Sequence, residues 1–178
     1  MMIIKTKLPE NSNLNIKDKR YDYVDSFQGA FSDNKNIITS VDIAKAFFSS
    51  SPDWVNKLFA LRNKIVTLFG LKTSGSLSDL QQQVDNFKCE PGEQLGLFKV
   101  FYKTGNEVIL GEDDRHLDFR VSLFLDNQKN EQSKKKLIIS TTVEFNNWLG
   151  RLYFLPVRPF HKAIVPTMLK GIINQLEN

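Results

Sequence analysis

The feature that most limits how this chain can fold is the alternation of apolar and polar side chains in LDFRVSLFL, residues 117 to 125. Its odd positions are all apolar, whereas its even positions include Asp118, Arg120 and Ser122. Successive side chains of a strand point to opposite faces of a sheet. A period of two therefore predicts a strand with one wholly apolar face and one largely polar face.

The neighbouring segments predict antiparallel partners for this strand. LGLFKVFYK, a Gly-Asn turn signal and EVILG form one predicted hairpin. LDFRVSLFLD and LIISTTVEF, joined by the charged loop NQKNEQSKKK, form a second hairpin. A further strand is expected in YDYVDSFQGAF, residues 21 to 31. We therefore expect five strands.

Two helices are expected between the first strand and the hairpins. Thr39 and Asp42 have the spacing of a capping box ahead of the first helix, and Ser51-Pro52 opens the second. In the second helix, apolar residues recur every three to four positions as far as Phe69. Residues 71 to 93 are interpreted as a linker with one short helical turn near residues 79 to 84.

The tail has a helical pattern of apolar residues that three prolines interrupt. Each proline removes a backbone donor from a helix. The pattern predicts a short helix over Asn147 to Leu155, a bend at Pro156 to Arg158, and a main helix that begins at Pro159.

This order of elements predicts an α+β fold in which an antiparallel sheet curves around a long C-terminal helix, the helix-grip arrangement. At 178 residues, one domain over residues 1–178 is expected, with flexibility confined to the ends, residues 1 to 16 among them. The composition, with 41% hydrophobic residues and 14 Phe, is that of a globular protein with an aromatic-rich interior.

Composition and motifs also exclude several classes of function. The net charge of +4 is spread over short groups without a nucleic-acid-binding motif, so no nucleic-acid partner is expected. No apolar run is long enough for a membrane span. The single cysteine, Cys89, and the lack of a signal-peptide pattern predict a cytoplasmic protein in which Cys89 is an unpaired loop thiol. The motifs GxGxxG, GxxxxGK[ST], GxSxG, HxxE, HxxxH and CxxC are absent, so neither a cofactor nor a metal is expected.

The stretch GEDDRHLDFR, residues 111 to 120, is the densest cluster of ionisable side chains, and His116, Asp118 and Arg120 are its catalytic candidates. The hairpin register places Arg120 opposite Thr142 and Asp118 opposite Glu144, so Arg120 should lie within reach of both carboxylates. The alternative is a solvated ladder of ion pairs on the outer side of the sheet, with His116 in a hydrogen bond at the strand end.

Three stretches resemble a family of mostly bacterial proteins of unknown function: DIAKAFFSSSPDWVNKLFALRNKIV, VILGEDDRHLDFRVS and GRLYFLPVRPFHKAIVPTML. Domains of that family occur alone or behind a nucleotide-binding, short-chain dehydrogenase-like domain. The family is similar to the wider helix-grip superfamily of START-type lipid carriers, polyketide cyclases and pollen-allergen-like proteins. Five predicted strands, where seven are usual in that superfamily, imply a smaller cavity.

Three functional hypotheses follow. The first is a domain that binds a hydrophobic or amphipathic small molecule against Phe119, Val121, Ile139 and Met168, with Arg158 and His161 receiving a carboxylate or phosphate at the pocket opening. The alternative for Arg158 is a surface pair with Asp113 or Asp114. The second hypothesis is an enzyme of cyclase or isomerase type that uses the cluster at 113–120. The third is an accessory module that docks on a dehydrogenase-like partner through PVRPFH and a strand edge.

Overall fold

The computed structural model describes residues 2–50, 52, 80–127 and 134–177. A seven-stranded antiparallel sheet has the order β1-β2-β7-β6-β5-β4-β3. Its strands are β1 (Ile3–Thr6), β2 (Tyr23–Ser32), β3 (Gln94–Leu95), β4 (Phe98–Lys103), β5 (Glu107–Asp113), β6 (Leu117–Asn127) and β7 (Lys134–Phe145). The described helices are α1 (Ser40–Ser49), α3 (Leu80–Asn86) and α4 (Trp148–Glu177).

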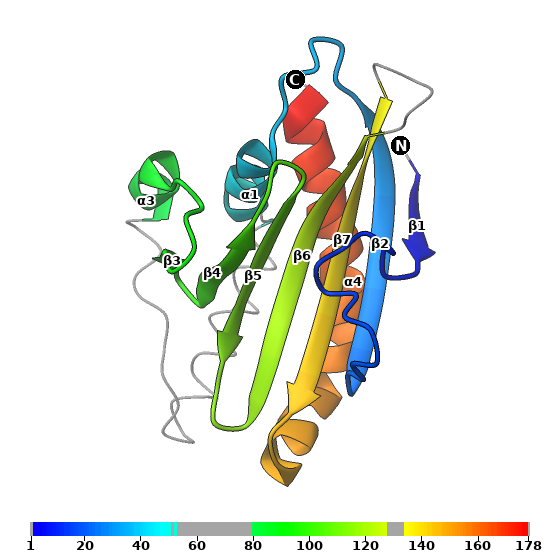
Figure 1. Cartoon of the computed structure of the whole chain (residues 1–178), viewed down its shortest axis with the longest axis vertical. Coiled ribbons are helices and arrows are strands. Elements are labelled where there is room, and N and C mark those ends of the chain that lie inside the picture. Colours follow the sequence, from blue (N-terminus) through cyan, green and yellow to red (C-terminus); the bar gives the residue numbers. More distant parts are fainter. Residues whose placement is uncertain (1, 51, 53–79, 128–133, 178) are drawn as a thin grey trace.

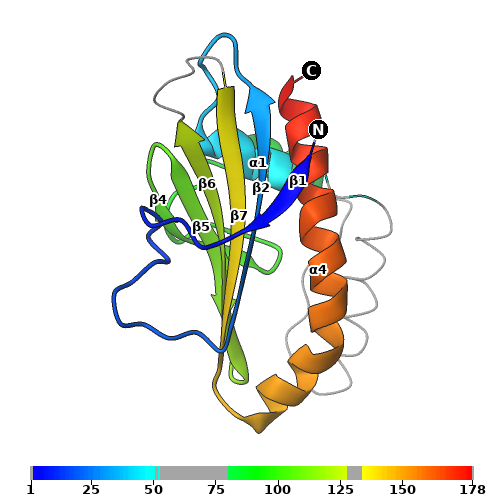
Figure 2. The same ribbon diagram turned by 90° about the vertical axis from the view of Figure 1, so that its right-hand side faces the viewer.

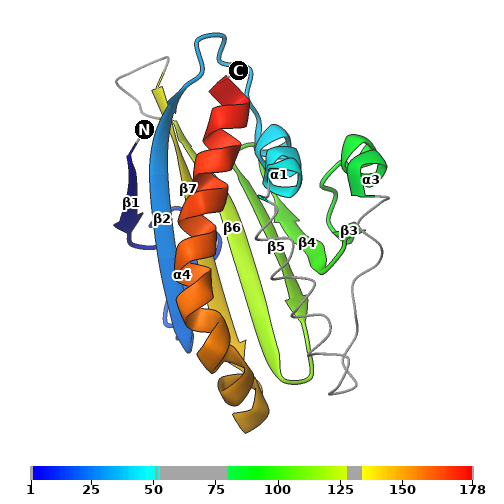
Figure 3. The same cartoon turned by 180° about the vertical axis from the view of Figure 1, so that it is seen from behind.

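The helices cover one face of the sheet, called the inner face below (Figure 1, Figure 3). Helix α4 packs against β2 and β7, while α1 packs against α4, β5 and β6. The segment between β1 and β2 crosses the opposite, outer face, as the view along the sheet in Figure 2 shows. This α+β arrangement is the one predicted and is consistent with a helix-grip fold.

The inner face forms the main core because apolar side chains alternate inward on each central strand. Leu123 of β6 is paired with Ile139 of β7 and Val108 of β5, and all three are almost fully buried. Above them α4 contributes buried apolar side chains, among them Leu169, Ile172 and Ile173. The helix lies close to β2 at Gly29, where an added Cβ would lie 2.6 Å from Ile173 Cδ1.

The sequence located most of the strands and the first helix. Thr39 and Asp42 form the predicted capping box of α1, and both predicted hairpins are present. The predicted turn near residues 79 to 84 corresponds to α3. The predicted second helix, residues 51 to 69, lies outside the described residues. The prediction of five strands is wrong, since β1 and β3 add two strands of four and two residues, too short for a period of two to reveal.

The predicted division of the last segment into two helices is also wrong. Pro156, Pro159 and Pro166 all lie inside α4, which remains helical over 30 residues. Its axis curves in Figure 2, but no new helix begins at Pro159.

The position of the prolines on α4 explains why the helix continues. A proline leaves unpaired the carbonyl of the residue four positions earlier, which here belongs to Leu152, Leu155 and Lys162. All three are exposed, the two leucines by 55% and 65% of their surface, so water can bind these carbonyls.

The outer segment is held to the sheet by Glu107, whose side chain is completely buried. Its Oε1 accepts hydrogen bonds from Ser12 Oγ (2.6 Å) and Ser122 Oγ (2.5 Å). Its Oε2 accepts from the backbone amide and the Nδ2 of Asn13, at 2.8 and 2.6 Å. Residues of the expected flexible end are thus anchored on β5 and β6.

Candidate functional site

A polar cluster lies within the apolar inner face, between the sheet and α4. It is formed by Tyr23 and Asp25 of β2, Thr141 of β7 and His161 of α4. The side chain of Asp25 is only 3% exposed, and its Oδ2 lies 3.1 Å from His161 Nδ1. The Tyr23 hydroxyl donates to the same oxygen at 2.5 Å. Burial raises the pKa of Tyr23, and the hydrogen bond to Asp25 raises it further, so the phenol keeps its proton.

Two buried polar atoms of this cluster make no hydrogen bond within the described part of the chain: Asp25 Oδ1 and Thr141 Oγ1. Asp25 and Thr141 are direct partners in the β2–β7 ladder and point to the same face, so their side chains are neighbours. Both residues are at least 96% buried. Leaving a buried polar atom unpaired costs about 1–3 kcal/mol, which makes such atoms candidates for binding a ligand.

The register surrounds this cluster with apolar side chains that the sequence predicted as pocket lining. Val121 is the β6 partner of Thr141, and Phe119 is the partner of the next inward residue of β7, Val143. Ile139 precedes Thr141 by two positions on the same face. These residues, together with Met168 of α4, belong to the main core or pack against it. The register therefore places Phe119, Val121 and Ile139 beside the polar cluster on the inner face.

The two predicted anchors on α4 have different surroundings. His161 faces the sheet and contacts Asp25, with its ring edge to face against Tyr23 at a centroid distance of 6.0 Å. Arg158 is exposed, and its Cζ lies 5.6 Å from the centre of the Tyr23 ring. Asp113, the alternative partner predicted for Arg158, pairs with Arg120 instead.

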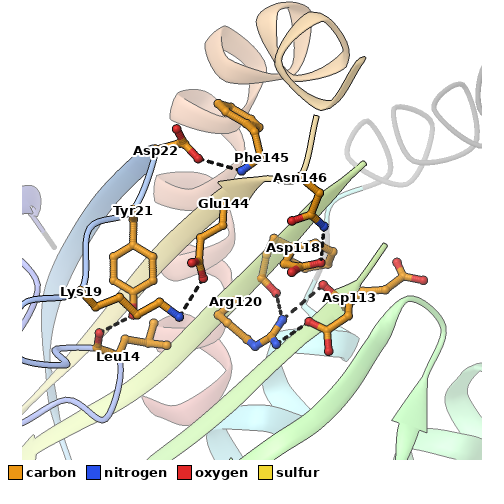
Figure 4. A network of polar contacts seen from close by, with 12 residues as sticks. Leu14, Lys19, Tyr21, Asp22, Asp113, Asp118, Arg120, Glu144, Phe145 and Asn146 are labelled. Carbon is orange, nitrogen blue, oxygen red and sulfur yellow. Dashed lines mark hydrogen bonds and ion pairs between the residues drawn. The ribbon is translucent and has the colours of Figure 1, made fainter. Parts of the chain in front are cut away.

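Asp118 and Arg120 of the cluster at 113–120 lie on the outer face, opposite the inner cluster, and His116 lies in the turn between β5 and β6. His116 Nδ1 lies 3.2 Å from Oδ1 of Asn147, the residue that caps α4 by accepting from Gly150 N. Asp118 Oδ1 accepts from Asn146 Nδ2 at 3.0 Å and from the backbone amide of Asp114 at 3.1 Å. These contacts join the β5–β6 turn to the start of α4, as Figure 4 shows for Asp118 and Asn146.

The ladder register predicted around Arg120 is confirmed, with Arg120 opposite Thr142 and Asp118 opposite Glu144. Arg120 nevertheless pairs with Asp113 (2.5 Å) and not with Asp118 or Glu144, and Glu144 pairs with Lys19 (2.9 Å), as drawn in Figure 4. These contacts match the alternative of ion pairs along the outer face.

Local packing explains the choice of partner. The β5 partner of Arg120 is Gly111, and an added Cβ there would lie 3.0 Å from Arg120 Cδ. The glycine lets the arginine lie across β5, where its Cζ is 3.5 Å from the centre of the Phe101 ring. Lys19 belongs to the outer segment, residues 7 to 22 between β1 and β2. The sequence patterns did not predict where this segment lies on the sheet.

A groove of about 350 Å³ lies on the outer face, where the N-terminal segment crosses the sheet. It is lined by Thr6, Lys7, Leu8, Pro9, Glu10, Asn11, Phe124, Asp126 and Ile138. It is a separate place from the inner cluster, because Ile138 and Ile139 point to opposite faces of β7.

Other chemical groups do not form a site in the described residues. Cys89 is fully buried in the core, and burial raises the pKa of its thiol to about 11. The described residues contain no group of three or more His, Cys, Asp or Glu suited to a metal ion. None of the helices in the described ranges is long and apolar enough to cross a membrane.

Sequence reasoning missed Tyr23, Asp25 and Thr141, although a signal for two of them was present. Asp25 lies on the same face as Phe27, Gly29 and Phe31, and Thr141 interrupts an apolar series in LIISTTVEF. A polar residue at a position where the alternation requires an apolar one is the pattern that would have found both.

These features define a class: an α+β protein whose C-terminal helix covers an antiparallel sheet and encloses a polar cluster. The chain belongs to the family described as "Protein of unknown function (DUF2867)", whose model matches residues 18–168. No curated protein matches the chain. No solved structure matches it either. The matched range includes every residue of the inner cluster.

Proposed function

We propose that the chain binds an amphipathic small molecule between the inner face of the sheet and α4. The apolar body of the ligand packs against Phe119, Val121, Ile139 and Met168. Its polar end binds at Asp25 and Thr141, beside His161 and Arg158.

One observation carries this proposal: two neighbouring polar atoms, Asp25 Oδ1 and Thr141 Oγ1, are buried without a hydrogen-bond partner in the described chain. A ligand group that supplies the missing bonds removes the cost of burying them unpaired. The surrounding apolar side chains bury the rest of the ligand, which is the usual composition of a small-molecule site.

The proposal is tested by placing extra volume on either face of one strand. Ile139→Phe adds side-chain volume on the inner face, and Ile138→Phe is the matched change on the outer face. A thermal-shift and calorimetric screen would use fatty alcohols, fatty acids, sterols and aromatic metabolites. We expect ligands that stabilise the wild type and Ile138→Phe but not Ile139→Phe. Equal binding by both variants, or no binding in the whole screen, contradicts the proposal.

The proposal assigns no reaction to His116, Asp118 and Arg120. Their polar groups engage the helix cap, the β5–β6 turn and the Phe101 ring, so their contacts support a structural role.

A second candidate, an accessory module for a dehydrogenase-like domain, is favoured by an exposed apolar stripe on α4. The stripe consists of Trp148, Leu152 and Leu155, which are 69%, 55% and 65% exposed and lie on one side of the helix at spacings of four and three residues. Arg151 and Arg158 are exposed on the same stretch and favour an acidic partner surface.

The test of this second candidate is size-exclusion chromatography with a dehydrogenase-like domain taken from a fused relative. Leu152→Glu/Leu155→Glu should abolish a complex that the wild type forms, while leaving small-molecule binding unchanged. A wild-type chain that elutes separately from that domain contradicts this second role.

A further inference from the structure

We propose that the polar end of the ligand is a single neutral hydroxyl group, so that the ligand class is an apolar alcohol. This inference rests on the proposed function and adds to it the chemistry of the bound group. It differs from the carboxylate or phosphate that the sequence alone suggested for this site.

The hydrogen-bonding capacity of the two unpaired atoms specifies this group. Asp25 Oδ2 is occupied by the Tyr23 hydroxyl and His161 Nδ1, which leaves Oδ1 as an acceptor in need of a donor. The Thr141 hydroxyl has a proton to donate and lone pairs to accept with. One ligand hydroxyl placed between the two side chains donates to Asp25 Oδ1 and accepts from Thr141 Oγ1, and so satisfies both.

Other head groups fit these two atoms less well. A carboxylate has no proton to donate to Asp25 Oδ1 at neutral pH, and a carboxylate or a phosphate would bring an anionic group into the apolar surroundings of the Asp25 carboxyl. A primary ammonium can donate to Asp25, but it offers no acceptor to the Thr141 hydroxyl and must lose its hydration among Val121 and Ile139.

The experiment compares three ligands of equal chain length, decan-1-ol, decanoate and decylamine, by calorimetric titration. The variants are Thr141→Val, which removes the hydroxyl at nearly constant volume, and Thr142→Val, whose side chain points to the outer face. We expect the wild type and Thr142→Val to bind decan-1-ol at least about tenfold more tightly than the other two ligands. Thr141→Val should weaken decan-1-ol binding by roughly 3- to 10-fold, as expected for one neutral hydrogen bond.

A second readout separates this inference from a loss of folding. Because Thr141 Oγ1 is unpaired within the described chain, Thr141→Val should leave the thermal stability of the ligand-free protein unchanged or slightly higher. Tighter binding of decanoate or decylamine, or equal decan-1-ol binding by Thr141→Val and the wild type, overturns the hydroxyl assignment but leaves the proposed function in place. Absence of binding by all three ligands, together with a negative screen, contradicts the proposed function as well.

Discussion

Glu107 shows how one residue can hold an otherwise irregular segment in place. Its carboxylate accepts four hydrogen bonds, from Ser12, Asn13 and Ser122, in a fully buried position. A buried carboxyl group is stable there only because each of its oxygens is hydrogen-bonded. The pattern around Glu107 did not predict this, because its partners on the outer segment are about 95 residues away in the sequence.

Replacing Glu107 by Gln should lower the free energy of unfolding by about 2–3 kcal/mol, because an amide NH₂ would face donors that need an acceptor. Chemical denaturation measures the change. Glu10→Gln, at an exposed position, is the matched control and should change stability by less than about 0.5 kcal/mol. Similar values for the two variants would show that the outer segment is not anchored through Glu107.

The inner cluster is the residue-scale feature that sequence reasoning could have found. Asp25 and Thr141 occupy apolar positions of two strands whose pairing was only partly predicted. The pairing of Arg120 with Asp113, in contrast, depends on Gly111 and Phe101 of the neighbouring strands. The alternation within one strand cannot predict contacts between side chains of different strands. Alternation identifies the face of a side chain, but it does not identify the partner that the side chain chooses.

At the scale of whole elements, long periodic segments were predictable and their ends were not. The central strands and α1 follow directly from alternation and from the capping box at Thr39. Helix α4 was predicted to break because proline has a large average cost in a helix. The average cost takes no account of whether water can reach the affected carbonyls. This depends on which side of α4 faces solvent, and only the packed structure gives that information.

Because α4 is continuous, we can predict how replacing Pro159 changes the free energy of unfolding. Inside a helix, Pro159→Ala restores a backbone donor and should raise the free energy of unfolding by up to about 3 kcal/mol. If Pro159 were instead the first residue of a helix, Pro159→Ala would lower the free energy of unfolding by about 0.4–1 kcal/mol. The reason is that alanine gives the unfolded chain more conformational freedom, which is lost on folding. Urea denaturation distinguishes these signs, and Lys162→Ala serves as a control at an exposed helical position with little expected effect.

A buried ion pair joins the loop before α1 to the start of β7. Lys135 Nζ lies 2.6 Å from Asp33 Oδ2, and the two side chains are 6% and 3% exposed. Burial alone would raise the pKa of Asp33, but the hydrogen bonds from Lys135 and from the amides of Ile38 and Ile37 outweigh it. The pKa of Asp33 is therefore held below its usual value of 3.8.

This lowered pKa predicts how stability depends on pH. The contribution of the pair is fully present above the unfolded pKa of Asp33 and is lost as the pH falls through the lower folded pKa. Denaturation between pH 5 and pH 2 should therefore show a steeper loss of stability in the wild type than in Asp33→Asn/Lys135→Met. The double variant avoids an unpaired buried lysine, which by itself would cost about 3–5 kcal/mol. Equal slopes would show that Asp33 does not carry this dependence.

At the scale of the whole molecule, the two faces of the sheet differ in chemistry. The outer face is covered by the outer segment, which Glu107 holds in place, and carries surface ion pairs. The inner face is apolar apart from a few groups such as the inner cluster. The fold class followed from the order of predicted elements. The position of the candidate site did not, because it depends on how α4 brings His161 over β2.

The most direct test of ligand binding on the inner face is a methyl NMR titration of the full chain with decan-1-ol. Ile139 and Ile138 are adjacent on β7 and report on the inner and outer faces within one sample. We predict saturable shifts at Ile139, Val121 and Met168, with the Ile138 methyl groups unchanged. Shifts confined to Ile138 would place the ligand in the outer groove and contradict binding on the inner face, as would the absence of any saturable shift.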